Sequence, residues 1–457
     1  MQRVSRTRDL LSYRAELITG QKSWLRVVMF LFGLSLSTNV VYAFTVGNTC
    51  VYIGYVFAFA LCGYLVVSGR KRASAKLDLI DGSIWAFAAV ACLSVSLSII
   101  YSVSGQLPSE TPLVALRGLV VLFCGLVVYY VVARLSEYAK YLVMGLALGV
   151  IVNGFVSALQ MVAFESGSYF TLYYLFPQDS FSISADWGIW GTLPDGAGRI
   201  TSFRSQGLFL ETSHLMVFLV CIAPIAFVVL RSTVARVVIL IATIFCCITS
   251  LSPNVLFVLV ECALLLLVSP KKSGFIERKV RRGWIFVSLA TMFALICMVA
   301  LRSDFVISGI ESVTNAIADL NFLTSTDEGT MGRWESMLSA LSACLQYPLG
   351  TGWNTESLVL SHVYGSSEVA SHSYVIRLLL EMGIVGIIAY IALVLRHSIP
   401  LLSRNSNIEE LAIGLSVVFL FVCQATNGMT FVPWAWALLG LSSVAIRAAE
   451  KRRQNGK

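Results

Sequence analysis

Long apolar runs recur along the chain and limit what it can fold into. Twelve runs are each long enough, at about 17 to 25 residues, to cross the hydrocarbon core of a bilayer as a helix. They lie near residues 24–46, 49–68, 82–101, 114–133, 141–164, 213–230, 234–250, 253–269, 284–301, 374–395, 410–427 and 430–447. Because 57% of the 457 residues are hydrophobic and 13% are charged, the composition excludes a soluble protein. The sequence predicts an all-α fold, a polytopic transmembrane helical bundle forming a single integral membrane domain over 1–457.

The basic residues predict which side of the membrane each connection faces. An even number of spans returns both termini to one side. Placing that side in the cytoplasm puts all nine lysines, and 27 of the 33 lysines and arginines, in the cytoplasm. This is the bias expected of a correct topology. The basic N-terminal residues and the absence of a small-residue cleavage site predict an uncleaved anchor.

Two extracytoplasmic segments, residues 165–212 and 302–373, are much longer than the other outer connections, and we expect function to reside on them. The basic residues left on the outer side are all arginines: Arg117, Arg199, Arg204, Arg302, Arg333 and Arg377. A guanidinium is a planar fork of donors that grips phosphate oxygens in pairs, so the set indicates a diphosphate ligand. The alternative is that several of these arginines pair with nearby carboxylates.

The sequence gives no indication of a metal or another cofactor, and we expect none. None of the eleven cysteines forms a Cys-x-x-Cys pair, and no His, Cys, Asp or Glu cluster has the spacing of metal ligands. We therefore expect a metal-independent reaction. The basic residues are dispersed between spans and not gathered on one soluble face, so nucleic acid is not an expected partner.

The stretch from 330 to 386 contains candidate catalytic residues and the start of a predicted membrane-spanning helix. Apolar residues recur at helical spacing from Arg333 to Leu345, which predicts an amphipathic helix along a surface, ended by Pro348 and the following glycines. His372 comes just before an apolar helix predicted from Tyr374 to Leu395. An imidazole titrates near neutral pH, so at this boundary it can act as an acid or a base. The alternative is a structural histidine.

Two further sets of polar residues allow two interpretations each. Arg377 and Glu381 are four residues apart within a predicted span, where they form either a private ion pair or part of the lining of a substrate cavity. In residues 202–214, Thr212 or Ser213 can cap the following helix and Glu211 is favoured by the helix dipole. The functional interpretation makes Glu211 a base. Glu261 is a further charge within a span, with no partner evident from the sequence.

The stretch from 330 to 386 resembles the O-antigen polymerase and O-antigen ligase superfamily of membrane glycosyltransferases. The matching positions are Arg333, Trp334, Pro348-Leu349-Gly350-Thr351-Gly352, His372-Ser373 and Gly383-Ile384-Val385-Gly386. The sequence departs from the family pattern in placing Trp directly after Arg and Ser373 where Asn is commoner. Residues 202–214 resemble an Arg-x-x-Gly segment leading into Glu-Pro-Ser-His, with Thr212 in place of the proline. This second segment is more typical of the polymerases.

The resemblance implies a GT-C-like enzyme of the bacterial inner membrane, with short helices on two large periplasmic loops and a periplasmic active site. Its donor would be a glycan linked through diphosphate to undecaprenol, and its acceptor a hydroxyl. A polymerase extends another lipid-linked repeat unit in O-antigen, capsule or exopolysaccharide synthesis, whereas a ligase acts on lipid A core; we favour the polymerase. Membrane lipids and a chain-length regulator are the other partners considered. The alternative from another class is a 12-span transporter of lipid-linked sugars, in which binding groups lie near the bilayer midplane.

The resemblance also assigns roles to residues. Arg204 and Arg333, with Arg117 and Arg377, would bind the diphosphate, because fixed cations stabilise the charge that develops on the leaving group. His372 or Glu211 would take the proton from the acceptor hydroxyl. The secondary candidates are Arg199, His214, Trp334 and Glu381.

Overall fold

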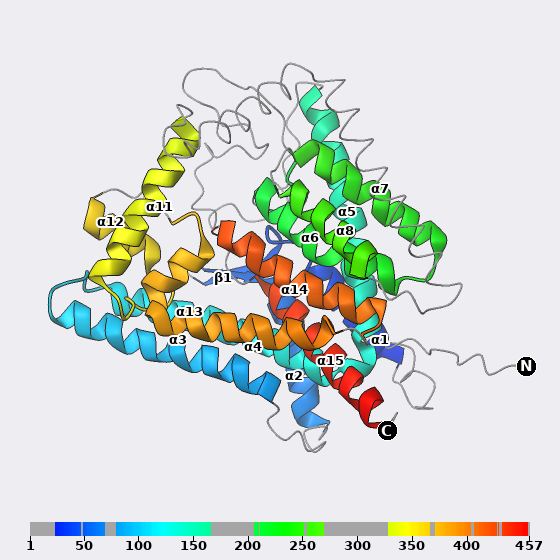
Figure 1. Ribbon diagram of the computed structural model, residues 1–457, viewed down its shortest axis with the longest axis horizontal. Coiled ribbons are helices and arrows are strands. Elements are labelled where there is room, and N and C mark those ends of the chain that lie inside the picture. Colours follow the sequence, from blue (N-terminus) through cyan, green and yellow to red (C-terminus); the bar gives the residue numbers. More distant parts are fainter. Residues whose placement is uncertain are drawn as a thin grey trace, which may run out of the picture.

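The computed structural model describes residues 23–46, 49–68, 79–165, 205–209, 211–250, 254–268, 328–365, 371–403, 406–426, 428 and 432–455. The α-helices there are α1 (Ser23–Ser35), α2 (Ile53–Val67), α3 (Leu79–Val103), α4 (Thr111–Arg134), α5 (Ala139–Glu165), α6 (Thr212–Val229), α7 (Thr233–Ser250), α8 (Val255–Val268), α11 (Glu328–Gln346), α12 (Glu356–Tyr364), α13 (Tyr374–Ser398), α14 (Ile408–Thr426) and α15 (Pro433–Asn455) (Figure 1). Among the described residues, seven helices are long and apolar enough to cross a membrane, namely α3 to α7, α13 and α14. The all-α polytopic membrane fold is confirmed, and the predicted span at 284–301 lies outside the described residues.

The two spans predicted nearest the N-terminus, 24–46 and 49–68, are wrong in length. Helix α1 ends at Ser35, and the chain then forms two antiparallel strands, β1 (Tyr42–Val46) and β2 (Thr49–Tyr52), before α2 begins. The Thr38 hydroxyl accepts hydrogen bonds from the backbone N–H groups of Val40 and Val41, each at 3.2 Å, which favours a turn over a continued helix. The β-branched residues that follow suit a strand.

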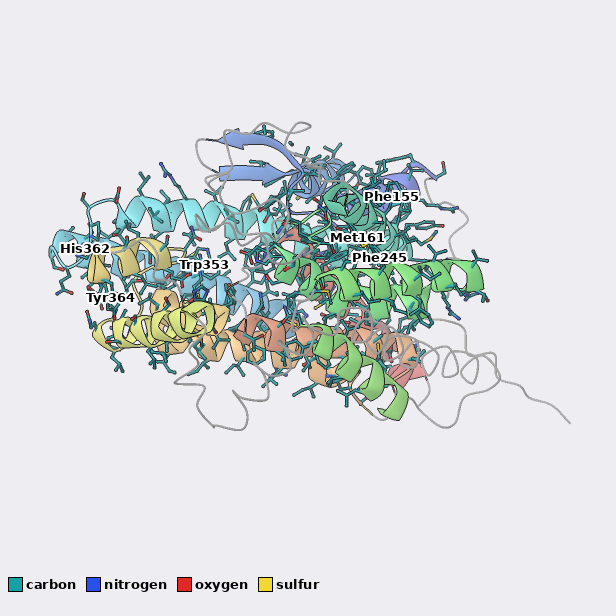
Figure 2. All side chains as sticks on the ribbon, turned by 90° about the horizontal axis from the view of Figure 1, so that it is seen from above. Phe155, Met161, Phe245, Trp353, His362 and Tyr364 are labelled. Atoms are coloured by element: carbon teal, nitrogen blue, oxygen red, sulfur yellow. The ribbon has the colours of Figure 1, made fainter. Side chains whose placement is uncertain are left out.

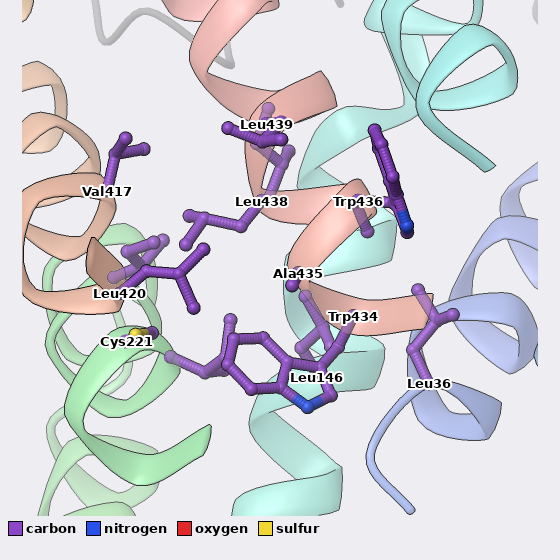
Figure 3. Close-up of a cluster of buried hydrophobic side chains, with 14 of the residues drawn as sticks. Leu36, Leu146, Cys221, Val417, Leu420, Trp434, Ala435, Trp436, Leu438 and Leu439 are labelled. Carbon is purple, nitrogen blue, oxygen red and sulfur yellow. The ribbon is translucent and has the colours of Figure 1, made fainter. Parts of the chain in front are cut away.

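The larger of two buried apolar clusters forms the core, and α15 occupies a central position in it. Trp434 and Trp436 are 0% and 1% exposed. The close-up in Figure 3 shows them beside Leu36 and Leu146, with Cys221 and Leu420 approaching from other helices. The ring of Trp434 packs edge-on against Phe218 of α6 at 5.7 Å between centroids. Since α6 is buried along nearly its whole length, α6 and α15 form the interior of the bundle.

Contacts between interhelical segments and helix termini identify the two ends of the helical bundle. At one end, Tyr347 donates a hydrogen bond to Gln106, Asn39 meets His214, and Ser205 meets Thr249. We call this the loop end. At the opposite end, which we call the basic end, Arg447 pairs with Asp81 and Arg452 pairs with Glu410. This division agrees with the predicted alternation of the spans, and the side of the cell that each end faces stays a prediction.

The predicted helix over 333–345 lies within α11 at the loop end. The face of α11 that packs into the protein carries the small residues Ala340, Ala343 and Cys344, whereas Leu338 and Leu345 are 46% and 84% exposed. The leucines therefore point away from the protein. Figure 2 shows His362 and Tyr364 of α12 at the outer edge of this region, with Trp353 deeper in the molecule.

Candidate functional site

Helix α13 is interrupted at Gly383, and the interruption builds the site. Gly383 has φ 66° and ψ −167°, outside the helical region, so Tyr374–Met382 and Ile384–Ser398 are two helices in series. The break leaves the carbonyl groups of Leu380 and Glu381 without their usual partners further along the helix. The loop after α11 supplies replacements, because Thr351 N donates to the Leu380 carbonyl and Gly352 N to the Glu381 carbonyl, both at 2.9 Å.

Two glycines that are distant in the sequence allow this contact. A Cβ at Gly383 would lie 2.6 Å from the Leu349 carbonyl carbon, and a Cβ at Gly350 would lie 2.6 Å from the Glu381 oxygen. In both cases the obstructing atoms belong to the backbone and cannot rotate away. The Pro-Leu-Gly-x-Gly and Gly-x-x-Gly motifs are therefore two halves of one contact.

Arg377 is the centre of a charged cluster six residues, nearly two turns, before the break. Its Nε donates to Glu381 Oε1 at 2.8 Å and lies 3.5 Å from Glu356 Oε2, while its Nη2 donates to Asn354 Oδ1 at 2.7 Å. The Arg377 side chain is 17% exposed, and those of Glu356 and Glu381 are 10% and 1% exposed. The predicted pairing of Arg377 with Glu381 is confirmed. Glu356 and Asn354 are partners that the sequence did not predict.

His372 is held in a left-handed backbone conformation, with φ 49°, which is uncommon for a residue other than glycine. The residue on each side of it is anchored: Ser371 N donates to Glu356 Oε1 at 2.7 Å, and the Ser373 hydroxyl caps α13 by accepting from Ile376 N. Its Cα faces Gly428, between α14 and α15, where an added Cβ would approach to 3.7 Å. Strained residues of this kind cluster at active sites and ligand-binding segments. Glu356 thus links the His372 segment directly to Arg377.

Arg117 lies beside this cluster on α4. It is exposed, and it precedes Gly118, whose carbonyl accepts a hydrogen bond from Trp353 Nε1 at 3.1 Å. A Cβ at Gly118 would lie 2.4 Å from the Cβ of Asn354. The absence of a side chain at Gly118 therefore lets the Trp353-Asn354 turn reach Arg377, and it places Arg117 at the edge of the same region.

Tyr347 and Cys344 lie close to this cluster and have little capacity to act as nucleophiles. Burial raises the pKa of the Tyr347 hydroxyl, and the neighbouring Tyr101 adds to the effect. Burial also raises the pKa of the Cys344 thiol to about 12. Both groups are therefore neutral near pH 7. Their positions suggest packing and hydrogen bonding.

A second polar cluster at the loop end contains Glu211 and His214. His214 Nε2 lies 3.9 Å from Glu211 Oε2, and its Nδ1 lies 3.2 Å from the amide nitrogen of Asn39. The Glu211 side chain is 58% exposed. Capping of α6 by Thr212 or Ser213 is wrong: the N-cap is Glu211, without a side-chain cap, and Ser213 instead donates to the Glu211 carboxylate at 2.9 Å. This hydrogen bond orients a carboxylate that is open to solvent.

Side chains inside the membrane-spanning helix α5 fix the segment before Glu211. Asn153 accepts from Leu208 N at 2.8 Å and donates to the Ser37 carbonyl at 2.9 Å. Gln160, two turns along the same helix, accepts from the N–H of Gly207 at 3.1 Å and donates to its carbonyl at 3.1 Å. Gly207 has φ +56°, and a Cβ there would lie 2.5 Å from the Asn153 oxygen. The Gly207 position of the second motif therefore requires glycine.

Several predicted site residues have no described side chain. Arg199 and Arg204 lie outside the described residues, and Arg333 and Trp334 are placed only as backbone in α11. In the part of the chain that the structure describes, no group of three or more His, Cys, Asp or Glu could hold a metal ion. The described candidates form two groups at the loop end, one of His372, Arg377, Glu381 and the neighbouring Arg117, and one of Glu211 and His214.

Sequence reasoning missed Glu356, Asn354, Asn153, Gln160 and Asn39. One signal was present, because Asn153 and Gln160 are polar residues seven apart on one face of an apolar helix. Glu356 and Asn354 gave no local signal, since they reach Arg377 only through the turn that folds against the break in α13.

These features define a class of protein: a polytopic membrane protein with conformationally fixed polar clusters at one end of its helical bundle. Residues 237–391, about a third of the chain, match the model of a family described as O-antigen ligase. The match includes the His372 segment, Arg377 and both glycine motifs, and it confirms the resemblance to the O-antigen polymerase and ligase superfamily. A search of curated proteins found no match to the chain.

Proposed function

We propose that this protein is a glycosyltransferase of the bacterial inner membrane whose donor is a glycan attached through diphosphate to undecaprenol. The acceptor is the hydroxyl of a second lipid-linked repeat unit, which makes the protein a glycan polymerase. The observation that carries the proposal is the family match, because it covers the fixed His372 segment and the Arg377 cluster. The Glu211–His214 element favours polymerase over ligase, and a chain-length regulator is a candidate partner.

The proposed reaction is a displacement at the anomeric carbon of the donor. The acceptor hydroxyl loses its proton to His372 or Glu211, and its oxygen forms the new glycosidic bond. The bond between that carbon and the phosphate oxygen breaks, and undecaprenyl diphosphate leaves with the electron pair. The negative charge that develops on the leaving group is stabilised by arginines. The chain's own residues supply each of these roles, and the reaction needs no metal.

The arginines divide into two kinds by their surroundings. Arg377 already has two carboxylate neighbours, so we assign it a positioning role. It orients Glu356, and Glu356 in turn holds the His372 segment through Ser371 N. Arg117 is exposed beside the same turn, so its guanidinium is accessible to a phosphate. We assign diphosphate binding to Arg117, Arg204 and Arg333, and we retain Arg199 as a secondary candidate. Glu381 shares the positioning role of Arg377.

The test is incubation of purified, reconstituted protein with a lipid-linked repeat unit and lipid A core, followed by analysis of chain length and of the acceptor. A ladder of products supports a polymerase, and transfer only to lipid A core supports a ligase. Translocation without bond formation would overturn the proposal in favour of a transporter. His362→Ala is the matched control for His372→Ala, because His362 is an exposed histidine on the neighbouring helix α12 and should be dispensable.

The proposed location of the site is tested by reporter fusions. Fusions after Arg72, Arg282 and Lys457 should report cytoplasm, and insertions within 170–195 and 355–365 should report the periplasm. A cytoplasmic signal from 355–365 would place α12, and the cluster packed against it, on the side without acceptor glycan. That result would contradict the mechanism even if the fold is correct.

A further inference from the structure

A cavity at the basic end lies far from both polar clusters and has no role in the proposed transfer. Its volume is about 560 Å³, and its lining comes from α2, α3, α4 and α15. Helix α4 packs against each of the other three helices (Figure 1). The cavity therefore forms where α2 and α3 lie on α4 and the C-terminal part of α15 closes one end.

Among the described residues, the charged lining of the cavity carries an excess of one positive charge. Its charged residues are Asp81, Arg134 and Arg447. Arg447 Nη2 donates to Asp81 Oδ2 at 2.7 Å, and the hydroxyl of Tyr129 donates to Asp81 Oδ1 at 2.7 Å. Asp81 is thereby occupied on both oxygens. Arg134 is exposed and stacks on the ring of Tyr130 at 5.3 Å, so its position is set by an aromatic ring.

The remainder of the lining is apolar and reaches along the side of the bundle. Phe123 and Trp85 both line the cavity and are 57% and 55% exposed. Both belong to helices that are candidate membrane spans, so their exposed faces lie where the hydrocarbon would be. Phe123 is eleven residues before Arg134 on α4, roughly 16 Å at 1.5 Å per residue. That length is close to one leaflet, half of a hydrocarbon core about 30 Å thick.

We propose that this cavity binds one anionic phospholipid of the leaflet at the basic end. The phosphate contacts Arg134 and the side of the Arg447 guanidinium that faces away from Asp81. One acyl chain lies over Phe123, between α2 and α3, in a groove that we call the acyl slot. Charge complementarity selects an anionic headgroup, because a zwitterionic lipid would add a cation beside two guanidinium groups. The apolar wall selects a lipid over a soluble anion, since a free phosphate leaves that wall uncovered.

The experiment is native mass spectrometry of the full-length protein in detergent, supplied with dioleoyl phosphatidylglycerol or dioleoyl phosphatidylcholine at equal concentration. We expect about fivefold greater retention of phosphatidylglycerol, because one arginine near an anionic headgroup contributes about 1 kcal/mol to the binding free energy. Arg134→Gln should abolish that preference. Arg396→Gln should preserve it, because Arg396 is an exposed arginine at the same end that does not line the cavity.

A second pair of variants tests the acyl slot. Cys62→Trp fills the cavity from α2 and should reduce retention of both lipids, whereas Cys92→Trp, at an exposed position on α3 outside the cavity, should not. Equal retention of the two lipids by the wild-type protein would overturn the proposal without any variant. An equal effect of Arg134→Gln and Arg396→Gln would also overturn the proposal, because it would indicate non-specific lipid binding around the transmembrane surface. Displacement of the lipid by millimolar inorganic phosphate would show a free-anion site instead.

Discussion

Replacement of Gly383 by alanine tests whether the contact between the two glycine motifs holds the site together. The residue has φ 66° and ψ −167°, a region that is essentially confined to glycine and costs about 1–3 kcal/mol for other residues. The new Cβ would also lie 2.6 Å from the Leu349 carbonyl carbon and from the Pro348 oxygen. Overpacking of this kind typically costs about 1–3 kcal/mol. The expected loss is about 4 kcal/mol, roughly a thousandfold in the folding equilibrium.

The assay is reversible unfolding in mixed micelles, with the fraction folded measured against the mole fraction of sodium dodecyl sulfate. Gly63→Ala is the matched control, because Gly63 is an exposed helical glycine with no atom within 4 Å of an added Cβ. That variant should be stabilised by about 1 kcal/mol, since alanine is the better helix former. Gly350→Ala obstructs the same contact from the other side, so the double variant should lose less than the sum of the two single losses. A Gly383→Ala protein as stable as wild type would refute the reasoning.

Three further predictions concern the candidate site and its support. His372→Ala should lose on the order of a hundredfold in transfer rate at unchanged melting temperature, the worth of a positioned base; full specific activity would move that role to Glu211. Arg204→Lys and Arg333→Lys should fail to restore transfer although charge is retained, because lysine lacks the bidentate fork, and wild-type rates in both would contradict diphosphate binding by these residues. Asn153→Leu should destabilise the protein by about 3 kcal/mol in the unfolding assay, because the half-buried Leu208 N–H and the buried Ser37 carbonyl lose their partner; unchanged stability would show that the loop is anchored elsewhere.

The helices from α3 to α7 could be located from the sequence to within a few residues. Each is a long apolar run bounded by polar or charged residues, and membrane insertion requires such a run to be helical. The same rule failed near the N-terminus because an apolar run also suits a strand. There the Thr38 turn and the β-branched residues after it favour two strands, although the hydropathy of the run predicts a membrane-spanning helix.

The candidate site could be predicted only where its residues carry a local signal. His372 stands at a span boundary, and Arg377 and Glu381 share a helix face, so their positions in the sequence were enough to identify them as candidates. The break at Gly383 could not be predicted, since a glycine within an apolar helix is ordinary and only the approach of Leu349 shows why this one is not helical. Glu356 was missed because its partner Arg377 is 21 residues further along the chain.

The interruption of α13 also determines how deep the charged cluster lies in the bilayer. Ile384–Ser398, the part after the break, has fifteen residues and extends about 22 Å, roughly 8 Å less than an average hydrocarbon core. Even if the part before the break continued in the same direction, Glu381 would lie about 26 Å from Ser398, a few ångströms inside the hydrocarbon core, and Arg377 about 31 Å from Ser398, at its edge. In the proposed transfer, a donor diphosphate that reaches the arginines beside this cluster would lie a few ångströms below the headgroups, with its isoprenoid carbons among the lipid tails and its sugars in water.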